Sequence, residues 1–149
     1  MARTKPPAPT PVSADDLELE LYAAMQGGDI ERLMAVWSDD DEITCVHPGG
    51  PRLVGAAAIR AAFEAMFAHG PIAVEPHRVR RLDSHSSAVH SVLERVRVRD
   101  KEGGEQFAWV LATNVYLKSA HGWRLVAHHA SPGAASEAQD VAETAATLH

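Results

Sequence analysis

The chain has 149 residues and a mass of 16.0 kDa, which fits one domain that can bury a core without covalent cross-links. Its single cysteine excludes an internal disulfide and a cysteine-based zinc site, and its formal charge of −6 argues against binding to nucleic acid or an anionic membrane. No apolar run approaches the roughly 18 residues of a membrane-spanning helix, and the N-terminus lacks the apolar stretch of a secretion signal, so we expect a cytoplasmic protein.

Four of the first eleven residues are proline, and the end of the chain consists mainly of alanine and polar residues. Proline disfavours a helix, and the final segment has few large apolar side chains to bury. We therefore expect a disordered tail at 1–14, one domain at 15–133, and a flexible or short helical tail at 134–149.

Three helices are expected in the first half of the domain. Ser13 is a candidate N-cap, leucines follow at helical spacing, and Gly27–Gly28 ends the first helix. Asp29 caps a second helix that ends near Trp37, and 55–69 forms a third, rich in alanine.

The rest of the domain changes from helical spacing to alternation, which is typical of strands. A short strand at 43–46 ends at the sequence His47-Pro-Gly-Gly, and alternating segments occupy 73–82, 87–99, 105–118 and 123–130. Turn-rich segments of hairpin length separate the last four, so we predict an α+β fold with an antiparallel four-strand meander. A curved sheet over helices leaves room for a pocket.

Three stretches in this order resemble a known family: 28–40, with its Gly-Asp helix junction; 45–59, with Cys-Val-His-Pro-Gly-Gly; and 112–132, with Ala-Thr-Asn-Val-Tyr and the final strand. They are similar to the SnoaL-like group of the nuclear-transport-factor-2-like (NTF2-like) superfamily, which includes ketosteroid isomerases. The resemblance implies an α+β cone with three N-terminal helices packed in the concave face of a curved antiparallel sheet. It implies no single activity, because this fold hosts many.

The resemblance also implies catalytic positions. The general base of the isomerase-like members precedes a proline, which places His47 there, and their oxyanion-stabilising acid aligns with Asn114. Their phenol donor falls near Leu21, and a helical step of about 100° is expected to turn Tyr22 away from it. The standard steroid isomerase is therefore not expected, while a histidine base with an amide donor is chemically sensible.

Two further residues are candidates for acid/base work. Glu94 alternates with apolar residues, so it is expected to be paired or to titrate abnormally, either as a site residue or in a structural ion pair. His128 and His129 must point to opposite faces of the last strand, and the resemblance favours His129 in the pocket and His128 outside. An interfacial or core role for His129, and structural roles for His47 and Asn114, remain open alternatives.

We expect the ligand-binding side chains to include Trp37, Trp109, Tyr116 and Ser131, although tryptophan is more often a core residue than a ligand contact. The chain has neither a phosphate-binding nor a dinucleotide-binding motif, and its histidines lack metal-ligand spacing, so no metal or other cofactor is expected.

The functional hypothesis is an apolar pocket for a small hydrophobic molecule, with cofactor-free isomerase, cyclase or dehydratase chemistry. The alternative is a non-catalytic ligand-binding or assembly module. In either case we expect a homodimer formed through the sheet. The arginines along the sheet have acidic neighbours, which favours a solvated or dimer-facing surface over an RNA site.

Overall fold

The computed structural model describes residues 11–133 and Asp140. In chain order its elements are α1 (Ala14–Gly27), α2 (Ile30–Val36), β1 (Thr44–Val46), β2 (Arg52–Val54), α3 (Ala56–Phe67), β3 (Val74–Asp83), β4 (Ser87–Arg99), β5 (Glu105–Ser119) and β6 (Gly122–Pro132). Most of both expected tails lies outside the described residues, and Ala14, which was expected in the first tail, already belongs to α1. None of the helices described is long and apolar enough to cross a membrane.

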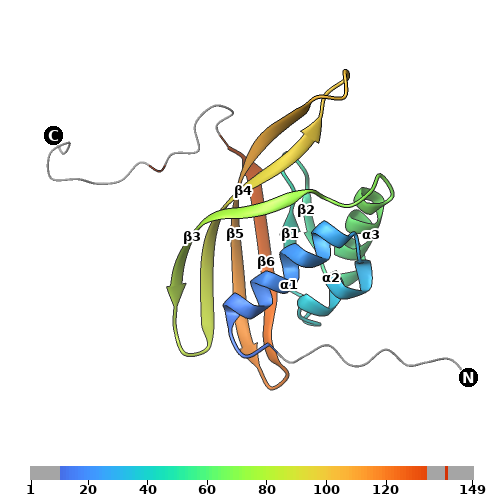
Figure 1. Ribbon diagram of the computed structural model, residues 1–149. Coiled ribbons are helices and arrows are strands. Elements are labelled where there is room, and N and C mark those ends of the chain that lie inside the picture. Colours follow the sequence, from blue (N-terminus) through green and yellow to red (C-terminus); the bar gives the residue numbers. More distant parts are fainter. Residues whose placement is uncertain (1–10, 134–139, 141–149) are drawn as a thin grey trace, which may run out of the picture.

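All strands belong to one curved sheet in the order β2-β1-β6-β5-β4-β3, and the helices lie on one side of it (Figure 1). The long strands β3 to β6 form the predicted antiparallel meander. The predicted fold class is confirmed, and the sheet as a whole is mixed, because β1 runs parallel to β6. Strand β2 was not predicted; it pairs with β1 across the turn that follows β1.

Local signals explain the junction between α1 and α2. The Ser13 hydroxyl accepts a hydrogen bond from the Asp16 amide at 3.0 Å and starts α1, and Gly28 ends it with a left-handed φ of +62°. The Asp29 carboxylate then accepts from the Arg32 amide at 3.1 Å and starts α2. The chain therefore turns sharply between two helices that both bury apolar side chains against the sheet.

A β-bulge in β6 reverses which residues face the helices. Tyr116 of β5 pairs with Leu125, but the preceding residue, Val115, pairs with Ala127, so Val126 is an extra residue in β6. Beyond the bulge, the inward positions are His128 and Ala130, which are buried like Leu125. The bulge therefore places His128, and not His129, on the concave face.

Buried polar side chains attach α1 to the sheet. Glu18 is 5% exposed, and its Oε2 accepts a 2.7 Å hydrogen bond from the Tyr116 hydroxyl and lies 2.8 Å from Nδ1 of His90. A carboxylate can be buried only where donors replace its water. These bonds therefore set the rotation of α1 over β4 and β5, and so the position of Tyr22 one turn later.

We expect Tyr116→Phe to lower the free energy of unfolding by about 1–3 kcal/mol, because Glu18 stays buried and loses a donor. Urea unfolding followed by circular dichroism measures this. Thr113→Val, on the exposed face of the same strand, is the control and should change stability by less than about 0.5 kcal/mol. An unchanged midpoint in Tyr116→Phe would show that α1 does not depend on this bond.

Candidate functional site

An apolar cavity of about 240 Å³ lies on the concave face, between the sheet and α1 and α3. Three side chains on its wall can exchange protons: His47, Glu94 and His128. The rest of the wall is apolar and consists of Met25, Pro48, Phe63, Met66, Ile72, Val74, Val96, Ala108, Val110 and Ala130. This combination of an apolar wall and a few polar groups is typical of a small-molecule site.

His47 lies in the turn between β1 and β2. Its carbonyl accepts from the Gly50 amide at 2.8 Å, and Gly49 adopts a φ of +74°, which closes a tight hairpin. The imidazole packs edge-on against the Phe63 ring at 4.8 Å, and its Nε2 lies 3.7 Å from Sγ of Cys45. Burial lowers the pKa of His47, so the ring is neutral at pH 7.

Glu94 faces inward from β4, as the alternation predicts, and is 6% exposed. Burial raises the pKa of its carboxyl group to about 7, although the hydrogen bond from Tyr22 opposes this shift. The Tyr22 hydroxyl donates to Oε2 at 2.6 Å. Glu94 is therefore both paired and abnormal in its titration, and it can hold or release a proton near neutral pH.

A line of hydrogen bonds connects Glu94 to His128. Asn114 on β5 donates from Nδ2 to the Tyr22 hydroxyl at 3.2 Å, and its Oδ1 lies 2.5 Å from Nδ1 of His128. His90, Asn114 and His128 are paired across β4, β5 and β6, which explains why the histidines and the amide share one face. Burial lowers the pKa of His128 to about 3, so its ring is neutral.

Two orientation predictions are wrong. His129 was expected in the pocket, but it is exposed on the opposite face, because the bulge at Val126 shifts the alternation by one residue. Tyr22 was expected to point away, but it is 2% exposed and bonded to Glu94. The α1 helix presents a broad buried face that includes Tyr22 as well as Leu21.

The four residues expected to bind ligand do not line the cavity. Trp37 is buried in the core beside Leu125, and Tyr116 is buried with its hydroxyl bonded to Glu18. Trp109 is half-buried on the outer face, edge-on to His77 at 5.4 Å, and Ser131 is exposed there. Ser131 follows the same shifted alternation as His129.

Sequence reasoning did not assign His128 or Tyr22 to the site. A usable signal existed for Tyr22, because Glu18, Tyr22 and Met25 recur at the spacing of one helix face. No signal existed for His128, because no residue type in β6 marks the bulge.

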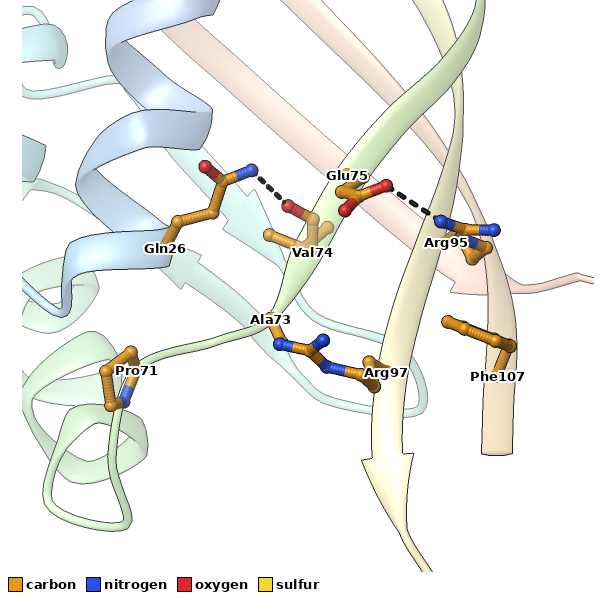
Figure 2. Close-up of a pocket in the computed structure, with 8 residues that line it drawn as sticks. All are labelled: Gln26, Pro71, Ala73, Val74, Glu75, Arg95, Arg97 and Phe107. Atoms are coloured by element: carbon orange, nitrogen blue, oxygen red, sulfur yellow. Dashed lines mark hydrogen bonds and ion pairs between the residues drawn. The ribbon is translucent and has the colours of Figure 1, made fainter. Parts of the chain in front are cut away.

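A larger hollow of about 540 Å³ lies where the start of β3 approaches the end of α1 (Figure 2). In this hollow, Arg95 donates a 2.9 Å hydrogen bond to Glu75, and its guanidinium group lies 4.4 Å from the centre of the Phe107 ring (Figure 2). The Gln26 amide donates to the Val74 carbonyl (Figure 2). These groups satisfy one another, and no histidine is among the residues that line the hollow. The smaller cavity with Glu94 is therefore the candidate site.

Within 11–133, no group of three or more histidine, cysteine or acidic side chains is placed to hold a metal ion. The chemistry that these side chains can supply themselves is proton transfer. Neutral imidazoles can accept a proton, and the Glu94 carboxyl can donate one.

Comparison with known proteins agrees with this architecture. The family model of the SnoaL-like domain matches residues 16–135. A search of curated proteins found no match.

Among solved structures, one similar chain comes from Thiobacillus denitrificans and is provisionally named a calcium/calmodulin-dependent protein kinase type II association domain. It is 34% identical, with a TM-score of 0.75 over 85% of this chain and 100% of that one. A provisionally named dehydratase of the NTF2-like family from Streptomyces avermitilis is 27% identical, with a TM-score of 0.70 over 78% of this chain and 91% of that one.

A third structure shows a shared fold alone. It is a ketosteroid isomerase-like protein from Erwinia carotovora atroseptica, 21% identical, with a TM-score of 0.64 over 79% of this chain and 92% of that one. The family match covers all of the helix-and-sheet unit described above except the first two residues of α1. This chain belongs to the SnoaL-like domain family, within the NTF2-like superfamily.

Proposed function

We propose that this protein is a cofactor-independent acid/base enzyme that acts on a small, mostly apolar carbonyl or hydroxy compound. The observation that carries the proposal is an apolar cavity whose wall holds a carboxyl group with a pKa near 7 and two neutral imidazoles. The similarity to a chain named a dehydratase supports the same class of chemistry.

In this mechanism His47 is the general base and Glu94 the general acid. His47 removes a proton from the carbon beside a carbonyl group, and a double bond forms as the bond to a hydroxyl group on the next carbon breaks. The proton of Glu94 passes to the departing oxygen, which leaves as water, and both residues return to their starting states by exchange with solvent. Asn114 is a positioning residue, because its amide bonds to Tyr22 and His128.

His47→Ala should lower the rate at least about 100-fold, because the general base is lost. The assay follows dehydration of 3-hydroxycyclohexanone to cyclohexenone by the absorbance of the enone. His121→Ala is the matched control, since that residue is exposed in the turn between β5 and β6 and does not line the cavity. Equal rates for His47→Ala and wild type, with melting temperatures within a few degrees, would remove His47 from the mechanism and favour a non-catalytic binding module.

The pH profile of kcat/KM should be bell-shaped, with its maximum on the acid side of pH 7. The rate should rise as His47 loses its proton, at a pKa below 6.5, and fall as Glu94 loses its proton near pH 7. Glu94→Gln keeps the size of the side chain but cannot supply a proton. Its kcat/KM should be at least about 100-fold lower than that of the wild type, and its pH profile should lack the alkaline decline. An unchanged decline in that variant would assign it to another group.

We further propose a homodimer formed through the outer face of the sheet. Exposed apolar side chains lie along this face of β5, namely Phe107, Leu111 and Leu117, and Val89 of β4 continues the patch. An exposed row of apolar side chains of this kind supports an interface between two copies of the chain. The similar chain named as an association domain supports assembly.

Leu111→Arg should convert the dimer to a monomer in size-exclusion chromatography with light scattering, because it buries a charge in the centre of the apolar patch. Leu19→Arg changes an exposed leucine of α1 and is the control that should leave the mass unchanged. A monomeric wild-type protein at micromolar concentration would contradict the proposal.

A further inference from the structure

The line of hydrogen bonds from Glu94 to His128 has both of its ends on the wall of the cavity. Its two middle members are fully enclosed: Tyr22 is 2% exposed and Asn114 is 0% exposed. A ligand can therefore meet the two ends, while the protein alone determines how the middle is arranged.

The direction of these bonds follows from Glu94. The Tyr22 hydroxyl donates its one hydrogen to Oε2, which can accept it both in the ionised carboxylate and in the acid that carries its proton on the other oxygen. The oxygen of Tyr22 then accepts, which requires the NH₂ group of Asn114 to face it and Oδ1 to face His128. Since Oδ1 can only accept, Nδ1 of His128 must carry the hydrogen of the neutral ring.

This arrangement gives His128 a defined tautomer. With the hydrogen on Nδ1, the other ring nitrogen, Nε2, has a lone pair and acts as an acceptor. Among the described residues it makes no hydrogen bond. The cavity therefore offers an acceptor at His128 and, when Glu94 is protonated, a donor on the carboxyl oxygen that Tyr22 does not occupy.

Charge further restricts what can bind. Neither a lysine nor an arginine is among the side chains that line the cavity, and both imidazoles have lowered pKa values. An anionic ligand would lose its water without gaining a cation, which costs several kcal/mol. A carboxylate or phosphate group is therefore a poor fit.

The volume of the cavity indicates the size of the group that fits inside it. An apolar cavity of about 150 Å³ holds benzene. The cavity here, of about 240 Å³, has room for one six-membered ring with a small substituent.

We propose that the cavity selects an uncharged, hydroxyl-bearing ring compound, whose O–H donates to Nε2 of His128 while its oxygen accepts from the carboxyl group of Glu94. A ketone oxygen has only lone pairs, so it would satisfy Glu94 but face the lone pair of His128. This inference rests on the proposed function for the location of the ligand. It adds the substrate class, and it makes the hydroxyl the group to which the acid donates its proton.

Four probes of similar size test the selection: cyclohexanol, cyclohexanone, methylcyclohexane and cyclohexanecarboxylate. Their dissociation constants are measured at pH 6, where Glu94 is mostly protonated, from NMR shifts of the cavity methyl groups. Cyclohexanol should bind about tenfold more tightly than cyclohexanone, the value of about one hydrogen bond, and the carboxylate should bind weakest. Equal or tighter binding of cyclohexanone would overturn the proposal.

The tautomer has its own measurement. Long-range ¹H–¹⁵N NMR of the unliganded protein should show His128 with a protonated Nδ1 and an unprotonated Nε2, and the reverse pattern would overturn the proposal. Asn114→Leu removes the amide that fixes the ring, so the preference for cyclohexanol over cyclohexanone should fall below about twofold. Thr113→Val, the neighbouring outward position, should keep the full preference. Should Asn114→Leu fail to fold, the wild-type spectrum and probe series still decide the matter.

These outcomes separate the two proposals. A preference for the alcohol without turnover of 3-hydroxycyclohexanone would leave the binding inference standing and reject the enzyme. Turnover that depends on His47, without a preference for the alcohol, would support the enzyme and reject the role of His128.

Discussion

The constraint on which the site depends is that polar groups buried under α1 must find hydrogen-bond partners within the protein. Glu18 meets Tyr116 and His90, and one turn later Tyr22 meets Glu94 and Asn114. A small rotation of α1 would leave these groups without partners, at a cost of about 1–3 kcal/mol each. The polar contacts therefore add directional constraints to the apolar packing of the same helix.

The same constraint explains the unusual titration of Glu94. Its surroundings are apolar enough to raise the carboxyl pKa to about 7, yet the hydrogen bond from Tyr22 keeps the ionised form accessible. An arginine in the place of Tyr22 would hold the carboxylate permanently ionised, whereas an apolar residue would favour the neutral acid further. A neutral phenol leaves the group poised between the two states.

The two imidazoles reach the cavity by different structural routes. The tight turn after β1 holds His47, and the parallel pairing of β1 with β6 brings this turn beside His128, with the ring centres 6.3 Å apart. His128 faces inward only because Val126 is an extra residue in β6. The site thus joins the end of one strand to a position just beyond a bulge in its neighbour.

Local patterns in the sequence determined the helices with their caps, the four-strand meander, the inward position of Glu94 and the family resemblance. These depend on interactions between residues close together in the chain, such as the Ser13 cap and the alternation along β4. The tertiary structure alone decided that His128 and Tyr22 belong to the site, and that His129, Trp109 and Ser131 lie on the outer face. The physical reason is that a bulge is a property of pairing between two strands, and that which of two adjacent helical residues meets Glu94 depends on how the helix docks. The bulge leaves no local mark in the sequence, and the spacing of Glu18, Tyr22 and Met25 marks a helix face without fixing where that face docks.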